Sequence, residues 1–191
     1  MLLSSFVCLV ASAVPVVLTP LIDRPGAVAY CDAVAGAMEE ASSSIDLLLS
    51  GADVTGVPLW DGLIDASDRG VVVRVLLDAS DWAPDITADN LRVLSYLTEH
   101  DIDCRLDDPG VTTHAKMVVV DRTVVVLGST NWNWYGFREH KQANVMIENP
   151  KIGEVYAEYF DRLWEARLPL HGVEIDFDGA VSGAPTIVPL P

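Results

Sequence analysis

The stretch THAKMVVVDRTVVVLGSTNW, residues 113–132, decides the fold of this chain. Two runs of valine flank the short segment DRT, residues 121–123. This pattern is typical of two strands joined by a tight turn, so the two strands must pair antiparallel. His114 and Lys116 open the first strand on one face, because side chains two residues apart in a strand point the same way. The stretch therefore predicts an apolar hairpin with two polar groups at its open end.

The open end of this hairpin should gather several more polar groups. The antiparallel register places Lys116 opposite about position 128 and His114 opposite about position 130. The residues that return to this end are Gly128, Ser129 and Asn131. Lysine and asparagine can bind the oxygens of a phosphate diester, while histidine can attack phosphorus or pass a proton to a leaving oxygen. The pattern predicts a site that handles phosphate; the plainer alternative is a solvent-facing edge strand.

Asp121 stands apart from this group of polar residues. Seven strand residues at ~3.3 Å each place it roughly 20 Å or more from His114. We expect Asp121 to organise the turn rather than to take part in chemistry.

The composition limits where a phosphate could bind. The chain has 191 residues, which suits one domain, and half of them are hydrophobic, which is enough for a packed core. Its formal charge is −16, from 28 acidic and 12 basic residues, so its surface as a whole repels nucleic acid and anionic lipid. A phosphate site must be a local exception. The sequence shows no cysteine or histidine spacing typical of zinc, and we expect a site without metal or cofactor.

The two ends of the chain differ from its middle. Residues 1–13 are apolar and end in Ala-Ser-Ala, which fits either a cleaved export signal or a buried first strand of a cytoplasmic protein. This run is too short and interrupted for a stable membrane span. Residues 14–170 should form the domain, and the Gly/Pro-rich residues 171–191 a tail. Cys31 and Cys104 should be buried thiols, although they could also pair.

Apolar strands and amphipathic helices alternate along the first part of the chain. The expected helices are 25–43, 58–70, 87–100 and 150–168, and the expected strands are 15–20, 45–51, 71–78, 102–108, 114–120, 124–129 and 143–148. Strands alternating with helices of this length indicate βαβ units with helices on the faces of a sheet.

The pattern His-x-Lys-x4-Asp-x6-Gly-Ser-x-Asn, from His114 to Asn131, resembles the signature of the phospholipase D superfamily. The likeness extends more loosely over most of the chain. It implies an α+β fold, an αβα sandwich whose mixed β-sheet is flanked by helices, as in the small dimeric nucleases of this superfamily. It also implies metal-independent hydrolysis of phosphodiester bonds, in nucleic acid or phospholipid, through a phosphohistidine intermediate.

The resemblance implies a role for each motif residue. His114 would be the nucleophile or, in a second copy, the acid that protonates the leaving group. Lys116 and Asn131 would hold the phosphoryl oxygens, and Ser129 would support them. Members normally combine two such motifs, and this chain has one, so the resemblance implies a homodimer with a shared active site. A different partner that brings the second motif is the alternative.

The residues after the motif depart from the family in one respect. The family usually has a glutamate a dozen or so residues past the asparagine, positioned to orient the histidine. Here Glu139 or Gln142 would have to fill that role. The residues nearby that could bind substrate are Trp132, Trp134, Arg138 and Lys141. Core packing explains the tryptophans equally well, and a solvated loop explains the two cations.

Three functions remain open from the sequence. The first is a phosphodiesterase. The second is a transferase that uses an alcohol in place of water, since both reactions pass through the same covalent intermediate. The third is a catalytically weak scaffold domain, which the missing glutamate favours.

Overall fold

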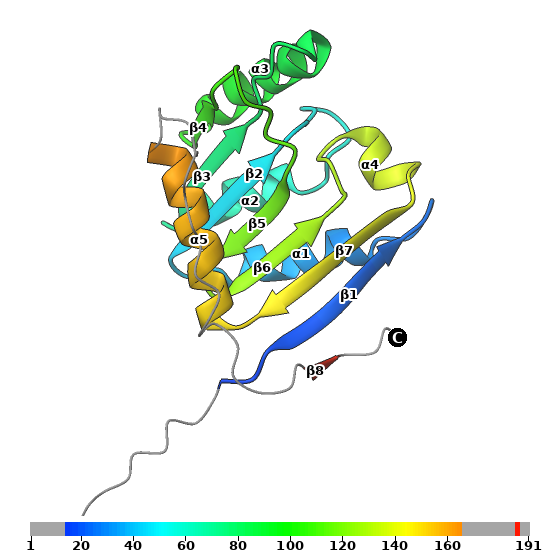
Figure 1. Cartoon of the computed structure of the whole chain (residues 1–191), viewed down its shortest axis with the longest axis vertical. Helices are drawn as coiled ribbons and strands as arrows, with labels where there is room; N and C mark the ends of the chain where they lie inside the picture. Colours follow the sequence, from blue (N-terminus) through cyan, green and yellow to red (C-terminus); the bar gives the residue numbers. More distant parts are fainter. Residues whose placement is uncertain (1–13, 166–185, 188–191) are drawn as a thin grey trace, which may run out of the picture.

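The computed structural model describes residues 14–165 and 186–187, and its strands form one sheet between two layers of helices (Figure 1). The helices are α1 (Ala29–Glu40), α2 (Trp60–Asp68), α3 (Pro84–Thr98), α4 (Trp134–Arg138) and α5 (Pro150–Glu165). The strands are β1 (Val17–Asp23), β2 (Ser44–Leu49), β3 (Val72–Leu77), β4 (Asp103–Leu106), β5 (Lys116–Val120), β6 (Val124–Gly128), β7 (Gln142–Glu148) and β8 (Thr186–Ile187).

The sheet is mixed, in the order β4-β3-β2-β5-β6-β7-β1-β8. Strands β2, β3 and β4 run parallel because a helix returns the chain between them, whereas β5, β6 and β7 are antiparallel neighbours. Strand β5 joins the two halves by pairing antiparallel with β2. The expected α+β sandwich with a mixed sheet is confirmed.

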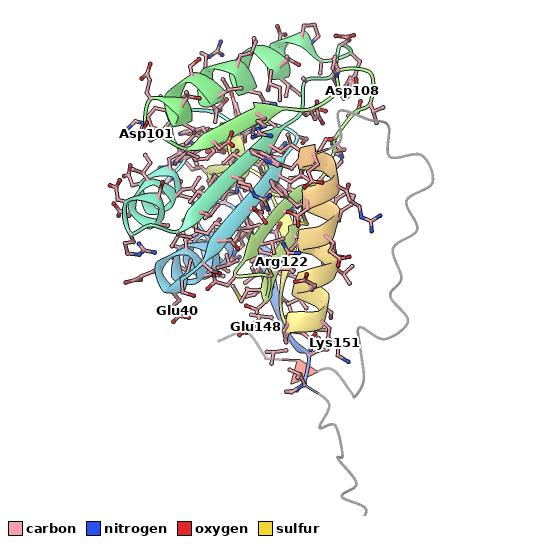
Figure 2. All side chains as sticks on the ribbon, turned by 90° about the vertical axis from the view of Figure 1, so that its left-hand side faces the viewer. Glu40, Asp101, Asp108, Arg122, Glu148 and Lys151 are labelled. Atoms are coloured by element: carbon pink, nitrogen blue, oxygen red, sulfur yellow. The ribbon has the colours of Figure 1, made fainter. Side chains whose placement is uncertain are left out.

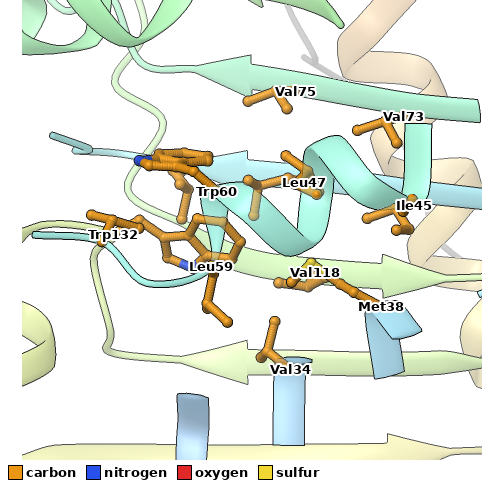
Figure 3. Packing of buried hydrophobic residues seen from close by; sticks show 14 of the residues in the cluster. Val34, Met38, Ile45, Leu47, Leu59, Trp60, Val73, Val75, Val118 and Trp132 are labelled. Atoms are coloured by element: carbon orange, nitrogen blue, oxygen red, sulfur yellow. The ribbon is translucent and has the colours of Figure 1, made fainter. Parts of the chain in front are cut away.

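Helices α1, α2 and α3 pack on one face of the sheet and α5 on the other (Figure 2). The larger core lies on the first face, where the two indoles of Trp60 and Trp132 meet with ring centroids 4.8 Å apart (Figure 3). Val34 and Met38 of α1 pack into the same core, beside Val118 of β5 (Figure 3). This face therefore excludes water from the whole width of β2, β3 and β5.

Helix α5 is fastened to the opposite face by ion pairs as well as by Phe160. Arg74 of β3 bridges Asp46, which is buried, and Asp161, which is partly exposed, each at 2.7 Å. Its guanidinium lies 4.9 Å from the Phe160 ring centroid. Arg122, seen beside α5 in Figure 2, adds a second bond to Asp161 at 2.9 Å. The turn between β5 and β6 is thereby tied to the helix.

The expectations for the two ends of the chain are tested only in part. Residues 1–13 lie outside the described residues, as does most of the expected tail. Thr186–Ile187 pairs with β1 as a short parallel strand. No helix among residues 14–165 is long and apolar enough to cross a membrane.

Cys31 and Cys104 are free, half-buried thiols, and burial raises the pKa of Cys104 to about 12.

Candidate active site

The hairpin of β5 and β6 has the predicted register. Met117 lies opposite Leu127 and Val120 opposite Val124, so position 116 faces position 128 at the open end. The motif residues before β5 and after β6 therefore converge, as expected from the sequence.

Asp121 lies at the other end of the hairpin and organises it. Asp121 and Arg122 both adopt left-handed backbone angles (φ 50° and 55°), which aspartate tolerates in turns. The Asp121 carboxylate accepts hydrogen bonds from the backbone and hydroxyl groups of Ser42 and Ser43 and from the backbone of Ser44, at 2.7–2.9 Å. Partial burial would raise its pKa, but these bonds hold the pKa well below its usual range. Asp121 thus locks the turn to the start of β2.

The Lys116 side chain is buried at the edge of the motif, although it is charged. It lies opposite Leu49 of β2 and is only 7% exposed, and its Nζ donates a hydrogen bond to the His114 carbonyl at 2.9 Å. Among the described residues no carboxylate lies within ion-pair distance of it. Burial lowers the pKa of Lys116, and the nearby Asp78 carboxylate opposes that shift. Burying a positive charge without an anion costs free energy of folding. Buried groups of this kind are often found at sites that bind a ligand.

His114 lies just before β5, on a segment that Asp78 holds in place. The Asp78 carboxylate is 2% exposed and accepts hydrogen bonds from the backbone of Thr113 and the hydroxyl of Ser80, both at 2.7 Å. The His114 side chain is itself exposed, and no described residue is hydrogen-bonded to its ring. The imidazole is therefore available to an incoming group, while the backbone that carries it is fixed.

Asn131 lies three residues past the end of β6, at the open end of the hairpin where β5 begins, and Ser50 fixes its amide. The Ser50 hydroxyl donates to Asn131 Oδ1 at 3.0 Å, which leaves the Nδ2 hydrogens for another acceptor. The fully buried Asn90 holds the supporting loops, since it accepts from the backbone of Ala52 and donates to the carbonyls of Ser50 and Asp78. The amide donor of the motif thus rests on a rigid base.

Ser129 is held by two residues of β7. The Ser129 hydroxyl donates to Gln142 Oε1 at 2.6 Å, and Asn144 Oδ1 accepts from the backbone of Ser129 and Thr130. A side chain at Gly128 would collide with Asn144, so the close approach of β7 requires glycine here.

Gln142, rather than Glu139, occupies the place next to the motif. Gln142 is 8% exposed and touches Ser129, whereas Glu139 caps the C-terminal end of α4 with an exposed side chain. Among the described residues, no three histidine, cysteine, aspartate or glutamate side chains are grouped so that they could hold a metal ion.

A family model described as "Cardiolipin synthase, PLD-like domain" matches residues 34–164, which include the whole motif. The chain belongs to the phospholipase D superfamily. The human protein named mitochondrial cardiolipin hydrolase is 33% identical to this PLD-like domain over 98 residues, covering 51% of this chain and 36% of that protein. Phospholipase D of Rickettsia prowazekii is 32% identical over 102 residues, covering 52% and 47%. Each alignment thus spans less than half the length of these relatives.

A solved structure resembles the fold. Nuc from Salmonella typhimurium, described as a phospholipase D family member, superposes with a TM-score of 0.66 and 22% identity. The match covers 78% of this chain and 94% of that chain. It supports the αβα architecture of this PLD-like domain.

The structure decides between the two alternatives for Trp132 in this PLD-like domain. Trp132 was expected to contact substrate or to pack in the core, and it does the second. Its side chain is 0% exposed, and its indole nitrogen donates to the Tyr30 hydroxyl at 2.9 Å. Trp132 therefore has no surface to offer a substrate. Trp134, by contrast, is 42% exposed, and Arg138 and Lys141 also lie on the surface.

Sequence reasoning missed the polar residues that support the site of this PLD-like domain. Ser50 and Asp78 each follow the last apolar residue of a parallel strand, and the carboxyl ends of such strands are where sites form. That signal was present in the sequence. Asn144 and Asn90 had no comparable signal, because Asn144 lies within a strand and Asn90 within a helix, where the sequence does not distinguish a buried amide from an exposed one.

Proposed function

We propose that this PLD-like domain hydrolyses phosphodiester bonds through a phosphohistidine formed on His114, without a metal, in a site completed by a second copy of the chain. The observation that carries the proposal is the buried Lys116, which has no carboxylate partner among the described residues. A diester phosphate is the kind of anion that such a site takes. The relatives named cardiolipin hydrolase and phospholipase D support the reaction class.

Covalent catalysis would proceed in two balanced steps. A ring nitrogen of His114 attacks phosphorus, the bond to the leaving oxygen breaks, and the bonding pair departs with that oxygen. His114 of the second copy donates the proton that the leaving oxygen needs. The same histidine then takes a proton from water, whose oxygen attacks phosphorus. The phosphorus–nitrogen bond breaks, which releases a phosphomonoester and restores His114.

Two side chains would stabilise the charge on the non-bridging oxygens. The Lys116 ammonium group supplies a positive charge in a place poor in water, where electrostatic attraction is strong. Asn131 supplies an amide donor, which Ser50 keeps turned so that its nitrogen is free. Ser129, held by Gln142, would support this arrangement.

The chemistry can be tested with bis(p-nitrophenyl) phosphate in excess EDTA. We expect wild-type protein to release nitrophenolate and His114→Ala to release none. His100→Ala is the matched control, because His100 is an exposed histidine at the end of α3 whose ring bonds only to the Tyr96 carbonyl. Turnover that requires an added metal, or that survives His114→Ala, would overturn the mechanism.

The shared site predicts how activity falls in mixed dimers. When wild-type and His114→Ala chains are unfolded together and refolded in equal amounts, only dimers with two intact copies should turn over. Activity should then fall to about a quarter, whereas independent subunits would retain about half. A linear fall with the wild-type fraction, or an active species that sizing shows to be a monomer, would refute the shared site.

A further inference from the structure

A pocket lies beside the motif, between the start of α1, the end of β1 and helix α4. Its volume is about 250 Å³. Its walls include apolar side chains and two arginines, namely Val28, Pro58, Phe137, Arg24 and Arg138. The pocket therefore combines apolar side chains with two positive charges and the single negative charge of Asp23. Such an excess of positive charge is unusual in a chain with a net charge of −16.

The two arginines of this pocket form no ion pair with any carboxylate that the structure describes. Arg74, Arg92, Arg105 and Arg122 each form an ion pair with a carboxylate. Within residues 14–165, the guanidinium groups of Arg24 and Arg138 make no such pair; those of Arg69 and Arg162 make none either, but neither of these lines the pocket. In a chain with more than twice as many acids as bases, two cations left unpaired at one pocket point to an external anion.

The carboxylate in the pocket wall is already occupied. Both oxygens of Asp23 accept hydrogen bonds from the backbone of α1, one from Ala29 and one from Tyr30, each at 2.9 Å. His140 lies at the wall too, with its ring stacked on Tyr135. Asp23 is thus directed at the helix rather than at the arginines.

One residue of the pocket wall belongs to the motif segment of the chain. Thr130 contributes to this wall and lies between Ser129 and Asn131 in the chain. Gly136 contributes as well, and its carbonyl accepts a hydrogen bond from Gln142 at 3.4 Å. The pocket wall is thus joined to the motif through Thr130 in the chain and through the hydrogen bond between Gln142 and Gly136.

We infer that this pocket binds a second phosphate group of the substrate, carried on an organic group that contacts Val28 and Phe137. The inference rests on the proposed function, since it assigns one phosphate to the motif and another to Arg24 and Arg138. Guanidinium groups bind phosphate oxygens in pairs, and the apolar wall favours a phosphate ester over a free anion. The substrate would thus be a molecule with two phosphate groups a short distance apart.

The test compares two substrates that differ by one phosphate: thymidine 5′-(p-nitrophenyl phosphate) with and without a 3′-phosphate. The 3′-phosphate should lower KM about tenfold in the wild type, the size of one charge-assisted hydrogen bond. Arg24→Gln/Arg138→Gln should lose this advantage, so that the two substrates have the same KM. Arg162→Gln, an exposed arginine of α5, is the control.

The outcomes separate the pocket from the chemistry. No effect of the 3′-phosphate in the wild type, or an advantage that persists in the double variant, would overturn the inference. Improved binding of the monophosphate substrate when inorganic phosphate is added would show a separate anion in the pocket and would also overturn it. If no substrate is turned over at all, the proposed function fails. Calorimetric titration of thymidine 3′,5′-bisphosphate into His114→Ala then decides the pocket, because binding should be lost when both arginines are replaced.

Discussion

Lys116 is expected to lower the stability of the folded domain while it contributes to catalysis. The side chain is 7% exposed, and its ammonium group has one hydrogen bond, to the His114 carbonyl. Replacing Lys116 with methionine keeps an unbranched side chain of similar length and removes the charge. The exposed His114 can offer its carbonyl to water instead, so no polar group is left buried without a partner. We expect the variant to be more stable than the wild type and inactive.

The size of both effects follows from the surroundings of Lys116. Replacing buried ionic groups by apolar ones of similar volume stabilises proteins by about 1–4 kcal/mol, and one ion near the protein surface belongs at the low end. A gain of about 1 kcal/mol raises Tm by roughly 2–4 °C in a domain of this size. Loss of one donor to a phosphoryl oxygen lowers kcat by about 10²–10³.

Thermal unfolding followed by circular dichroism, together with turnover of bis(p-nitrophenyl) phosphate, measures both effects. Because burial lowers the pKa of Lys116, the unfolded chain binds more protons than the folded one between the lowered value and the ordinary value of about 10.4. The stability advantage of Lys116→Met over the wild type should therefore shrink as pH rises across that window, because the groups with raised pKa values, such as Cys104, are common to both proteins. Arg162→Met, at an exposed arginine of α5, should change neither stability nor rate. A lower Tm in Lys116→Met, or activity near wild type, would refute this reasoning.

Three other substitutions test the supports of the site. Gly128→Ala should lower the free energy of unfolding in urea by about 2–3 kcal/mol, because the added methyl group meets Asn144; Gly36→Ala, with open space around it in α1, should be neutral or stabilising. Asp121→Asn should cost about 2 kcal/mol near neutral pH. Since the pKa of Asp121 is depressed in the fold, this loss should be complete above about pH 4 and vanish as pH falls through the folded pKa, which urea unfolding at several pH values would show. Ser50→Ala should lower kcat about tenfold with little change in Tm, because the Asn131 amide loses the bond that fixes its orientation; an equal loss of stability and rate would mean that Ser50 is only structural.

The local elements and the motif could be predicted from the sequence because each depends on short-range patterns. Valine runs on either side of DRT predict a hairpin whatever the rest of the chain does, and the spacing from His114 to Asn131 then fixes which side chains meet. The only charged residues in the segments that became β2 and β3, Asp46 and Arg74, pair with each other, and most other positions are apolar because both faces of these strands are covered.

The parts that could not be predicted depend on long-range packing. Trp132 follows the motif directly, yet it turns into the core because Trp60 and Tyr30 leave space for it there. Helix α4 has five residues, too few for a helical period to show. Whether Glu139 or Gln142 would lie next to Ser129 depended on where this helix ends.

The most direct test of the account is to find where the covalent intermediate forms. Wild-type protein would be quenched during turnover of bis(p-nitrophenyl) phosphate and digested, and its peptides weighed by mass spectrometry. We predict an acid-labile p-nitrophenyl phosphoryl group on the His114 peptide, absent from His114→Ala. An adduct on Ser129, or full turnover without any adduct under conditions where the intermediate should accumulate, would contradict the phosphohistidine mechanism.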